Sequence, residues 1–438
     1  MNLILLSGGS GRRLWPLSND ARSKQFIKLF KDDAGNMESM IQRVYRQIKS
    51  ADRGGSITVT TSKEQMASIR NQLGEDVRIC MEPGRRDTFP AIVLAASYLC
   101  DVEKLTLDEP VIVCPVDPFV REEYFEALKK LAALVAAEET ELTLMGIEPT
   151  YASEKYGYII PVSGADVCRV KTFKEKPDAK TAEKYIEQGA LWNSGVFAFR
   201  LGWLLEKAHG MIDFLGYHDL YDKYDGLDKI SFDYAVVEKT ENIQVMRFSG
   251  EWKDIGTWNT LAEVVGEPCI GNGILGSGCE NTDIINELDV PILCMGLKDT
   301  VVAASPQGIL VSDKESSSFM KPYVERIDQQ VMFAEKSWGS FRILDAREDS
   351  VTIKVILKPG RHMNYHSHAR RDEVWTVISG EGKTIIDGIE QDISVGDVIT
   401  VQARVRHTVM AKTDLELIEV QLGREISIHD KKIYDFEF

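Results

Sequence analysis

The chain has 438 residues, of which 44% are hydrophobic and 27% are charged, as in ordinary globular proteins. A chain of this length is expected to form two or three domains rather than one. Its net charge of −16 argues against nucleic acid or an anionic membrane as a general partner. Any phosphate group would therefore have to be bound by local basic side chains and backbone N–H groups.

The cysteines and the N-terminus indicate a reducing compartment. The seven cysteines are scattered and form no CxxC pair, a pattern typical of reduced thiols. The opening MNLILLSGG is too short for the apolar region of a signal peptide, and no stretch reaches the length of a membrane span. We therefore expect a cytoplasmic protein that does not engage a membrane.

Short apolar strands alternate with amphipathic helices over residues 1–265. The alternation predicts a Rossmann-like α/β domain of three layers with a mostly parallel sheet, and ligands at the C-terminal ends of the strands. YGYIIPV and VCRVKTFKE are expected to be antiparallel strands, and WNSGVFAFR another strand. The expected buried strands are NLILL (2–6), SITVT (56–60), VRICM (77–81) and PVIVC (110–114), and the expected helices are MIQRVYRQI, EQMASIRNQL and TFPAIVLAASYL.

Two further regions follow along the chain. Residues 266–330 begin with Gly and Asn and continue with PILCMGL, TVVAAS and GILVS, so we expect a small β-rich connecting domain with a helix near 315–327. From Trp338 onward, short strands are broken by PG, SGEG, DG and VGD. This pattern predicts an all-β barrel or sandwich over residues 331–438.

A glycine-rich turn follows the first strand. Gly8, Gly9 and Gly11 are followed by Arg12 and Arg13 in LLSGGSGRRLWPLSND. Glycines let backbone N–H groups approach a triphosphate closely, and an arginine can neutralise its charge. A turn of this kind is equally common as a tight loop without any ligand.

The longer string GGSGRRLWPLS…KQF is far more specific than the turn alone. It resembles the signature of the sugar-1-phosphate nucleotidyltransferases, and its LWPLS and KQF parts resemble the mannose-1-phosphate guanylyltransferases. Further blocks of the same resemblance follow in order: EPGRRDTFPAI (82–92), CPVDPFV (114–120), GIEPTYASEKYGYI (146–159), FKEKPD (173–178), LWNSGVFAF (191–199), SFDYAVVEKT (231–240) and WKDIGTW (252–258).

The resemblance implies that the chain makes GDP-mannose and pyrophosphate from GTP and mannose-1-phosphate. Both reactants are anions, so the site must supply positive charge and hold them in line. Asp117, at the end of a strand, and Asp254, in WKDIGTW, would bind Mg²⁺, a cation suited to carboxylates and phosphate oxygens.

The remaining site residues are implied by the same resemblance. Arg13 and Lys24 would contact the triphosphate, and Lys176 would hold the sugar phosphate. The expected nucleotide-binding set is Gly8, Gly9, Ser10, Gly11, Arg13, Glu82, Arg86 and Thr88, and the sugar-phosphate set is Gly157, Glu175, Lys176 and Asn193.

Two other functions remain open from the sequence. Where the family has Arg-Asn-Thr-Ala-Pro, this chain has Asp87 and Phe89, near the expected place of the base. The same reaction with another nucleotide or sugar phosphate is therefore an alternative. A degenerate sugar sensor is a second alternative. Five retained residues together argue against it: Arg13, Lys24, Asp117, Lys176 and Asp254. A second copy of the chain, in a homodimer, is counted among the expected partners.

Histidines gather in the C-terminal region: four of the seven lie between residues 362 and 407, whereas the first 200 residues have none. Their spacing resembles the cupin motifs. Alternating histidines place two imidazoles on one face of a strand, and such a ligand set suits Zn²⁺, Mn²⁺, Fe²⁺ or Ni²⁺. The alternative is a metal-free barrel with exposed histidines. The motif residues are Gly360, His366, His368, Glu373, Gly380, Gly396 and His407.

In guanylyltransferases of the long bifunctional type, an attached cupin performs mannose-6-phosphate isomerisation. SWGSFRILD (337–345) and LELIEVQLG (415–423) resemble that domain. Isomerisation needs a metal to polarise the carbonyl and a base to move a proton between C1 and C2. Arg371 is the candidate acid–base or phosphate-holding residue, and the sequence identifies no base.

Overall fold

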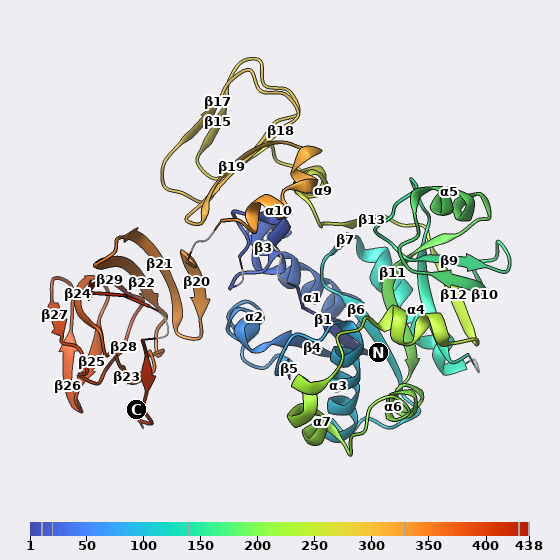
Figure 1. Cartoon of the computed structure of the whole chain (residues 1–438), viewed down its shortest axis with the longest axis horizontal. Coiled ribbons are helices and arrows are strands. Elements are labelled where there is room, and N and C mark those ends of the chain that lie inside the picture. The colour runs from blue at the N-terminus through green and yellow to red at the C-terminus, as the bar shows by residue number, and fades with distance from the viewer. Residues whose placement is uncertain (10–11, 20, 138–139, 328–329, 428–429, 437–438) are drawn as a thin grey trace. The chain divides into compact units, whose positions relative to one another are not determined.

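The structure is a computed structural model, and it describes residues 1–9, 12–19, 21–137, 140–327, 330–427 and 430–436, without the side chain of Arg12. The chain divides into two compact units (Figure 1). Residues 1–9, 25–256 and 263–265 form the first unit, and residues 10–24, 257–262 and 266–438 form the second. Of the helices in the described residues, none is long and apolar enough to cross a membrane.

The first unit is built on one large mixed sheet. The half that starts the chain is parallel, because β1 pairs with β4 and β6, and β4 with β5. The other half adds antiparallel strands, and the predicted antiparallel pairing of β9 with β10 is confirmed. The strand order is β5 (Arg78–Glu82), β4 (Ser56–Ser62), β1 (Asn2–Leu6), β6 (Pro110–Pro115), β11 (Leu191–Arg200), β8 (Leu142–Ile147), β12 (Ile243–Phe248), β10 (Val167–Lys174) and β9 (Tyr158–Pro161).

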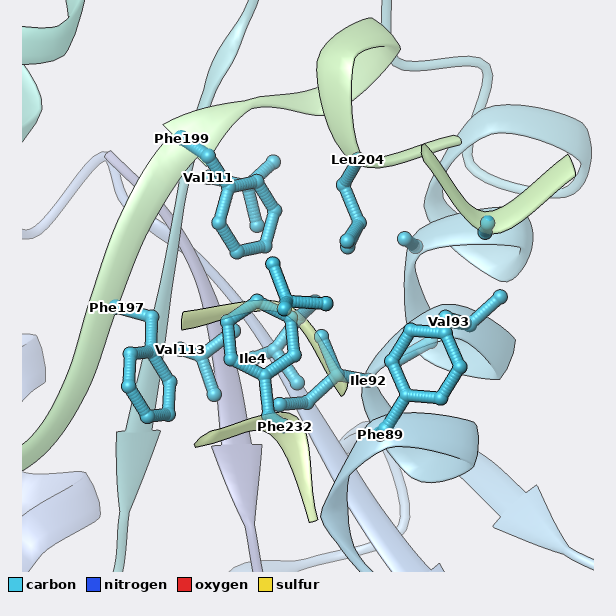
Figure 2. Close-up of a cluster of buried hydrophobic side chains, with 14 of the residues drawn as sticks. Ile4, Phe89, Ile92, Val93, Val111, Val113, Phe197, Phe199, Leu204 and Phe232 are labelled. Atoms are coloured by element: carbon cyan, nitrogen blue, oxygen red, sulfur yellow. The ribbon is translucent and has the colours of Figure 1, made fainter. Parts of the chain in front are cut away.

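Helices cover both faces of this sheet. Alternate residues of a strand point to opposite faces, and accordingly Ile4, Val111 and Val113 join one buried cluster together with α3 and α6 (Figure 2). Helix α4 packs on β6 and β8 and against α1. The predicted three-layer α/β fold is thus confirmed. The helices are α1 (Met40–Ala51), α2 (Met66–Leu73), α3 (Thr88–Asp101), α4 (Glu122–Ala137), α5 (Ala179–Glu187), α6 (Leu201–His209), α7 (Tyr217–Lys223) and α8 (Phe232–Ala235).

Two small sheets complete this unit. Strand β2 (Lys28–Lys31) pairs with β3 (Met37–Ser39), and Ser39 then caps α1 by accepting a hydrogen bond from the N–H of Gln42. Strand β7 (Pro118–Val120) pairs antiparallel with β13 (Trp252–Asp254), which joins segments more than 130 residues apart. This second pair matters for function because Asp117 and Asp254 flank it.

Residues 269–313 of the second unit form a coil of short, mostly parallel strands. Strand β14 (Cys269–Ile270) pairs with β16 (Asp283–Asn286), β16 with β18 (Thr300–Ser305), and β15 (Gly273–Leu275) with β17 (Ile292–Cys294), all in parallel. Strand β19 (Gly308–Asp313) closes it in antiparallel pairing. The helix expected near 315–327 is only two short turns, η6 (Ser316–Phe319) and α10 (Lys321–Val324).

The signature string of residues 12–19 packs against this coil, within the same unit. Trp258, in α9 (Trp258–Val265), donates its indole N–H to the carbonyl of Trp15 at 3.1 Å, and Ser305 donates to the carbonyl of Pro16 at 2.6 Å. A side chain at Gly308 would collide with the Trp15 ring, 2.5 Å from its Cβ position. The conspicuous LWPLS string therefore has a packing role, whatever its role in catalysis.

The C-terminal barrel consists of two facing sheets, as the sequence predicted. Its core lies between them, where Trp375 and Leu417 of one sheet meet Ile393 and Val409 of the other. One sheet has the order β20 (Phe333–Lys336), β21 (Gly339–Ala346), β22 (Ser350–Leu357), β29 (Leu415–Gly423), β24 (Arg371–Ser379) and β27 (Val398–Val401); the other has β26 (Ile389–Ile393), β25 (Gly382–Ile386), β28 (His407–Ala411), β23 (His366–Ser367) and β30 (Lys432–Ile433).

Candidate functional site

A cavity of about 220 Å³ lies at the C-terminal end of β6 in the first unit. Asp117 and Asp254 both line it, because Asp117 immediately precedes β7 and Asp254 ends β13, with Asp254 and Pro118 opposite each other in the ladder. The structure thus brings together the two acids predicted to bind Mg²⁺. Two carboxylates on one cavity wall are suitable ligands for a hard divalent cation.

Glu175, Asn193 and Gly157 line the same cavity, as expected for the sugar side. Lys176 donates to the Glu175 carboxylate at 2.5 Å, so its ammonium lies at the edge of this group. Gly157 approaches so closely that a Cβ there would lie 2.5 Å from a Glu175 oxygen. Its carbonyl also accepts the backbone N–H of Asn193 at 2.8 Å. A larger residue here would therefore displace the Glu175 carboxylate or the Phe173 ring.

Among the cavity residues that were not predicted, three have large side chains: Lys155, Tyr156 and Trp252. Within the described residues the Lys155 ammonium makes no ion pair, and the Trp252 indole N–H is buried without a hydrogen-bond partner. The Tyr156 ring packs between the rings of Trp192 and Trp252, with centroid–centroid distances of 4.8 Å and 5.6 Å. All three missed residues lie in family-like blocks, but lysine and aromatic residues in a loop carry no specific signal alone.

The glycine-rich turn is described in part. Gly8 and Gly9 are exposed after β1, and Gly9 has φ +110°, a conformation that favours glycine. Ser10 and Gly11 lie outside the described residues. Arg13 is exposed in η1 (Arg12–Leu14), and Lys24 begins η2 (Lys24–Phe26). Both belong to the segment grouped with the second unit, so their contact with the triphosphate stays a proposal.

The segment after β5 is tied to residues 224–232. Tyr224 donates to the Glu82 carboxylate at 2.9 Å, and burial raises the pKa of Glu82 to about 7. The Arg86 guanidinium donates to the carbonyl of Asp225, and the Thr88 hydroxyl accepts the N–H of Phe232 at 2.8 Å. These three predicted nucleotide ligands therefore also hold the loop that leads into α8.

Phe89, one of the two departures from the family in this segment, is a core residue. Its side chain is only 2% exposed and points into the buried cluster between the sheet and α3 (Figure 2). A bulky apolar side chain at the second residue of α3 is stabilised by burial in the core, and that Phe89 lies near the base stays a prediction. Asp87, just before it, caps the helix by accepting the N–H of Thr88.

The barrel brings its predicted metal ligands together. His366, His368 and His407 each present a ring nitrogen, and these atoms lie within 4.8 Å of one another. The carboxylate of Glu373 lies 3.1 Å from Nε2 of His368 and 3.3 Å from Nε2 of His407. All four side chains are buried, which excludes the alternative of exposed histidines.

The hydrogen bonds of the imidazoles show that this group suits a cation. Each Nδ1 faces a backbone carbonyl, of Asn364 for His366, Asp430 for His368 and Val405 for His407. A carbonyl can only accept, so Nδ1 carries the proton and every Nε2 offers a lone pair. Nε2 of His407 is buried without a hydrogen-bond partner in the described structure, although a Glu373 oxygen is near, because both atoms are acceptors. A divalent metal would satisfy both.

Other polar groups surround the barrel site. Arg371 donates from Nε to the Glu373 carboxylate and from Nη2 to Nε2 of His368, each at 3.0 Å. Its guanidinium thus contacts two predicted ligands. Glu419 is buried beside them and accepts from Gln421 at 2.6 Å. Burial and the nearby Glu373 carboxylate raise the pKa of Glu419 to about 8. This acid was not predicted, because it lies in a strand whose alternating pattern carries no sign of a functional residue.

Comparison with known proteins agrees with both parts of the chain. Residues 2–267 match the nucleotidyl transferase family, and residues 353–421 match the cupin domain family. The chain therefore belongs to the nucleotidyl transferase family and is an enzyme of that class, with a cupin domain attached. The predicted resemblance to mannose-1-phosphate guanylyltransferases that carry a cupin domain is confirmed.

Two relatives align with nearly the whole chain, and a solved structure with three quarters of it. The alginate biosynthesis protein AlgA of Pseudomonas putida is 30% identical, over 98% of this chain and 94% of its own. The mannose-1-phosphate guanylyltransferase of Salmonella montevideo is 27% identical, over 98% of this chain and 97% of its own. A crystal structure from Thermus thermophilus, described as mannose-1-phosphate geranyltransferase, has a TM-score of 0.62 and 28% identity, covering 75% of this chain and 99% of that one. The family implies nucleotide and sugar-phosphate substrates.

Proposed function

We propose that the chain transfers GMP from GTP to mannose-1-phosphate, which yields GDP-mannose and pyrophosphate. The observation that carries the proposal is the single cavity lined by Asp117, Asp254, Glu175 and Asn193. The similarity to the Salmonella montevideo guanylyltransferase supports the choice of base and sugar. The burial of the Phe89 side chain in the core supports a structural role for this departure from the family.

In this reaction a phosphate oxygen of the sugar-1-phosphate attacks the α-phosphorus of the nucleotide. The new O–P bond forms as the bond from that phosphorus to the bridging oxygen breaks, and pyrophosphate leaves. Asp117 and Asp254 would hold Mg²⁺, which supplies positive charge against the triphosphate oxygens when it is bound. No side chain needs to act as a covalent nucleophile. The enzyme contributes mainly by positioning and charge.

Residues in and beside the cavity are assigned either to the hydroxyl groups or to the phosphate of the sugar phosphate. Glu175 and Asn193 present an acceptor carboxylate and an amide, which suit sugar hydroxyls. Lys176, hydrogen-bonded to Glu175, and Lys155, on the cavity wall, would hold the sugar's phosphate. Arg13 and Lys24 would contact the triphosphate, with the N–H groups of the glycine-rich turn. We retain the cytoplasm as the site of the reaction and a homodimer as the expected assembly.

The experiment that tests this function is a substrate panel. Pyrophosphate release is measured with GTP, ATP, CTP and UTP, each paired with mannose-1-phosphate, glucose-1-phosphate or no sugar phosphate. GTP with mannose-1-phosphate should give the highest kcat/KM. Faster turnover with another pair would reassign the substrate. Binding without turnover for every pair would favour the sensor alternative.

The barrel favours a second activity, isomerisation of mannose-6-phosphate to fructose-6-phosphate. The three converging Nε2 atoms, with the Glu373 carboxylate, support a site for a divalent transition metal. Such a metal would polarise a carbonyl oxygen when bound. Arg371, whose guanidinium contacts His368 and Glu373, would hold an anionic group of the substrate. The test is formation of fructose-6-phosphate by the metal-loaded protein and by the chelated protein.

A further inference from the structure

The block SFDYAVVEKT was singled out in the sequence, yet none of the proposed roles uses it. It forms α8 and the turn after it, with Ser231 as the helix cap. Its acid Asp233 is half-buried and faces the cavity residues: the Asn193 amide donates from Nδ2 to Oδ1 of Asp233 at 2.7 Å. The bond joins positions 40 residues apart.

This bond fixes the orientation of the Asn193 side chain. The opposite end of the amide, Oδ1, accepts the backbone N–H of Gly195 at 3.2 Å. Since an amide has two donor hydrogens and two acceptor lone pairs, one of each remains for a ligand. Without the acceptor at Asp233, the amide would keep one of its two side-chain hydrogen bonds and could rotate about its last torsion.

The same block also supports the neighbouring strand end. Glu238 accepts the backbone N–H of Glu175 at 3.4 Å. Burial first, and then the charge of Glu175, raise the pKa of Asp233 to about 7, while the charge of Lys176 and the hydrogen bond from Asn193 lower it. Two acids of one block thus contact both residues assigned to the sugar hydroxyls.

We propose that Asp233 is a positioning residue for the sugar phosphate, which acts by holding the Asn193 amide in the orientation that meets a sugar hydroxyl. The inference rests on the proposed function, since it takes Asn193 to bind the sugar. It assigns to Asp233 no contact with the nucleotide. Its effect should therefore appear in the KM for the sugar phosphate and should depend on Asn193.

The test is a double-mutant cycle with Asp233→Ala and Asn193→Ala, measured by pyrophosphate release. Asp233→Ala should raise the KM for mannose-1-phosphate about tenfold, as for loss of a hydrogen bond to a charged group, and leave the KM for GTP within about twofold. Asp233→Asn should stay within about threefold of wild type, because its carboxamide oxygen can accept the same bond. In the Asn193→Ala background, Asp233→Ala should add less than about twofold.

The control is Asp219→Ala, which removes a half-buried acid of α7 that is paired with Lys223 and does not line the cavity, and should change neither KM. An equal rise in both KM values, or an undiminished Asp233→Ala effect without Asn193, would overturn the proposal. If the alanine variant does not fold, Asp233→Ser serves in its place. Calorimetric affinity for mannose-1-phosphate, measured on the same variants, tests Asp233 even if the wild-type protein releases no pyrophosphate.

Discussion

The transferase cavity and the barrel site differ in the groups that would bind charged ligands. The cavity presents carboxylates from loop and strand ends, together with an exposed lysine. The barrel buries three imidazoles whose Nδ1 atoms face backbone carbonyls, so the Nε2 atoms carry the lone pairs, of which that of His368 accepts from Arg371. The barrel site is therefore preorganised before any ligand arrives, whereas the cavity depends on its anionic substrates and a cation to balance its acids. The two sites should respond to different metals and to different substitutions.

The largest effect is expected at the cavity acids. Asp117→Asn and Asp254→Asn should each lower kcat/KM for pyrophosphate release by about 100-fold or more, since each removes a charge that opposes the phosphates through the metal. Barrel metal content should stay unchanged, as measured by elemental analysis of the same preparations. Near-normal turnover in both variants would contradict the two-carboxylate assignment.

Substitutions in the barrel should have the opposite outcome, with metal lost and nucleotidyl transfer kept. A His366→Ala/His368→Ala variant should lose its transition metal, because only His407 and Glu373 would remain as ligands. Its nucleotidyl transfer should remain within about twofold of wild type. Elemental analysis and pyrophosphate release are compared on one preparation. Wild-type protein that takes up no Zn²⁺, Mn²⁺, Fe²⁺ or Ni²⁺ on reconstitution would remove the metal site and the isomerase proposal together.

A smaller effect is expected at Lys155, a cation that lines the cavity beside its acids. Lys155→Gln should raise the KM for mannose-1-phosphate about three- to tenfold, because an exposed charge contributes only about 1 kcal/mol to binding a phosphate. The matched control is Lys184→Gln, an exposed lysine of α5 outside the cavity. Equal KM values in the two variants would show that Lys155 does not contact the phosphate.

Much of the fold was predictable because period and length are local properties. Strand β1 spans Asn2–Leu6 and β18 spans Thr300–Ser305, the ranges expected from their apolar runs. The parallel coil was not expected, since its two- and three-residue strands give no period, and neither was the pairing of β7 with β13, which joins distant segments. The ladders that bring the cavity residues together are properties of the folded chain.

The site shows the same division. Asp117, Asp254, Glu175 and Asn193 are all in family-like blocks and all line one cavity. Asp233 and Glu419 were missed, because their significance lies in what they face: Asn193 across 40 residues, and the inside of a barrel. Phe89 shows the converse, a departure from the family that proved to be a core residue.

The last expected effect is on stability rather than on catalysis, and it concerns Glu82, which is more deeply buried than Asp117 and Asp254. Its pKa rises from 4.5 to about 7 in the folded protein because the carboxylate is desolvated. Below pH 4.5 both folded and unfolded chains hold the proton. Between pH 4.5 and about 7 the folded chain holds it and the unfolded chain does not, so unfolding releases a proton and rising pH favours unfolding.

Glu82→Gln removes this titration but keeps an oxygen that can accept from Tyr224. The variant should therefore gain stability relative to wild type as pH rises from 5 toward 8, by roughly 1–3 kcal/mol in total. Urea unfolding of both proteins at several pH values, followed by a probe in the first unit, measures the difference. A constant difference across this range would mean that Glu82 stays ionised in the folded protein, and that Tyr224 stabilises it as a carboxylate after all.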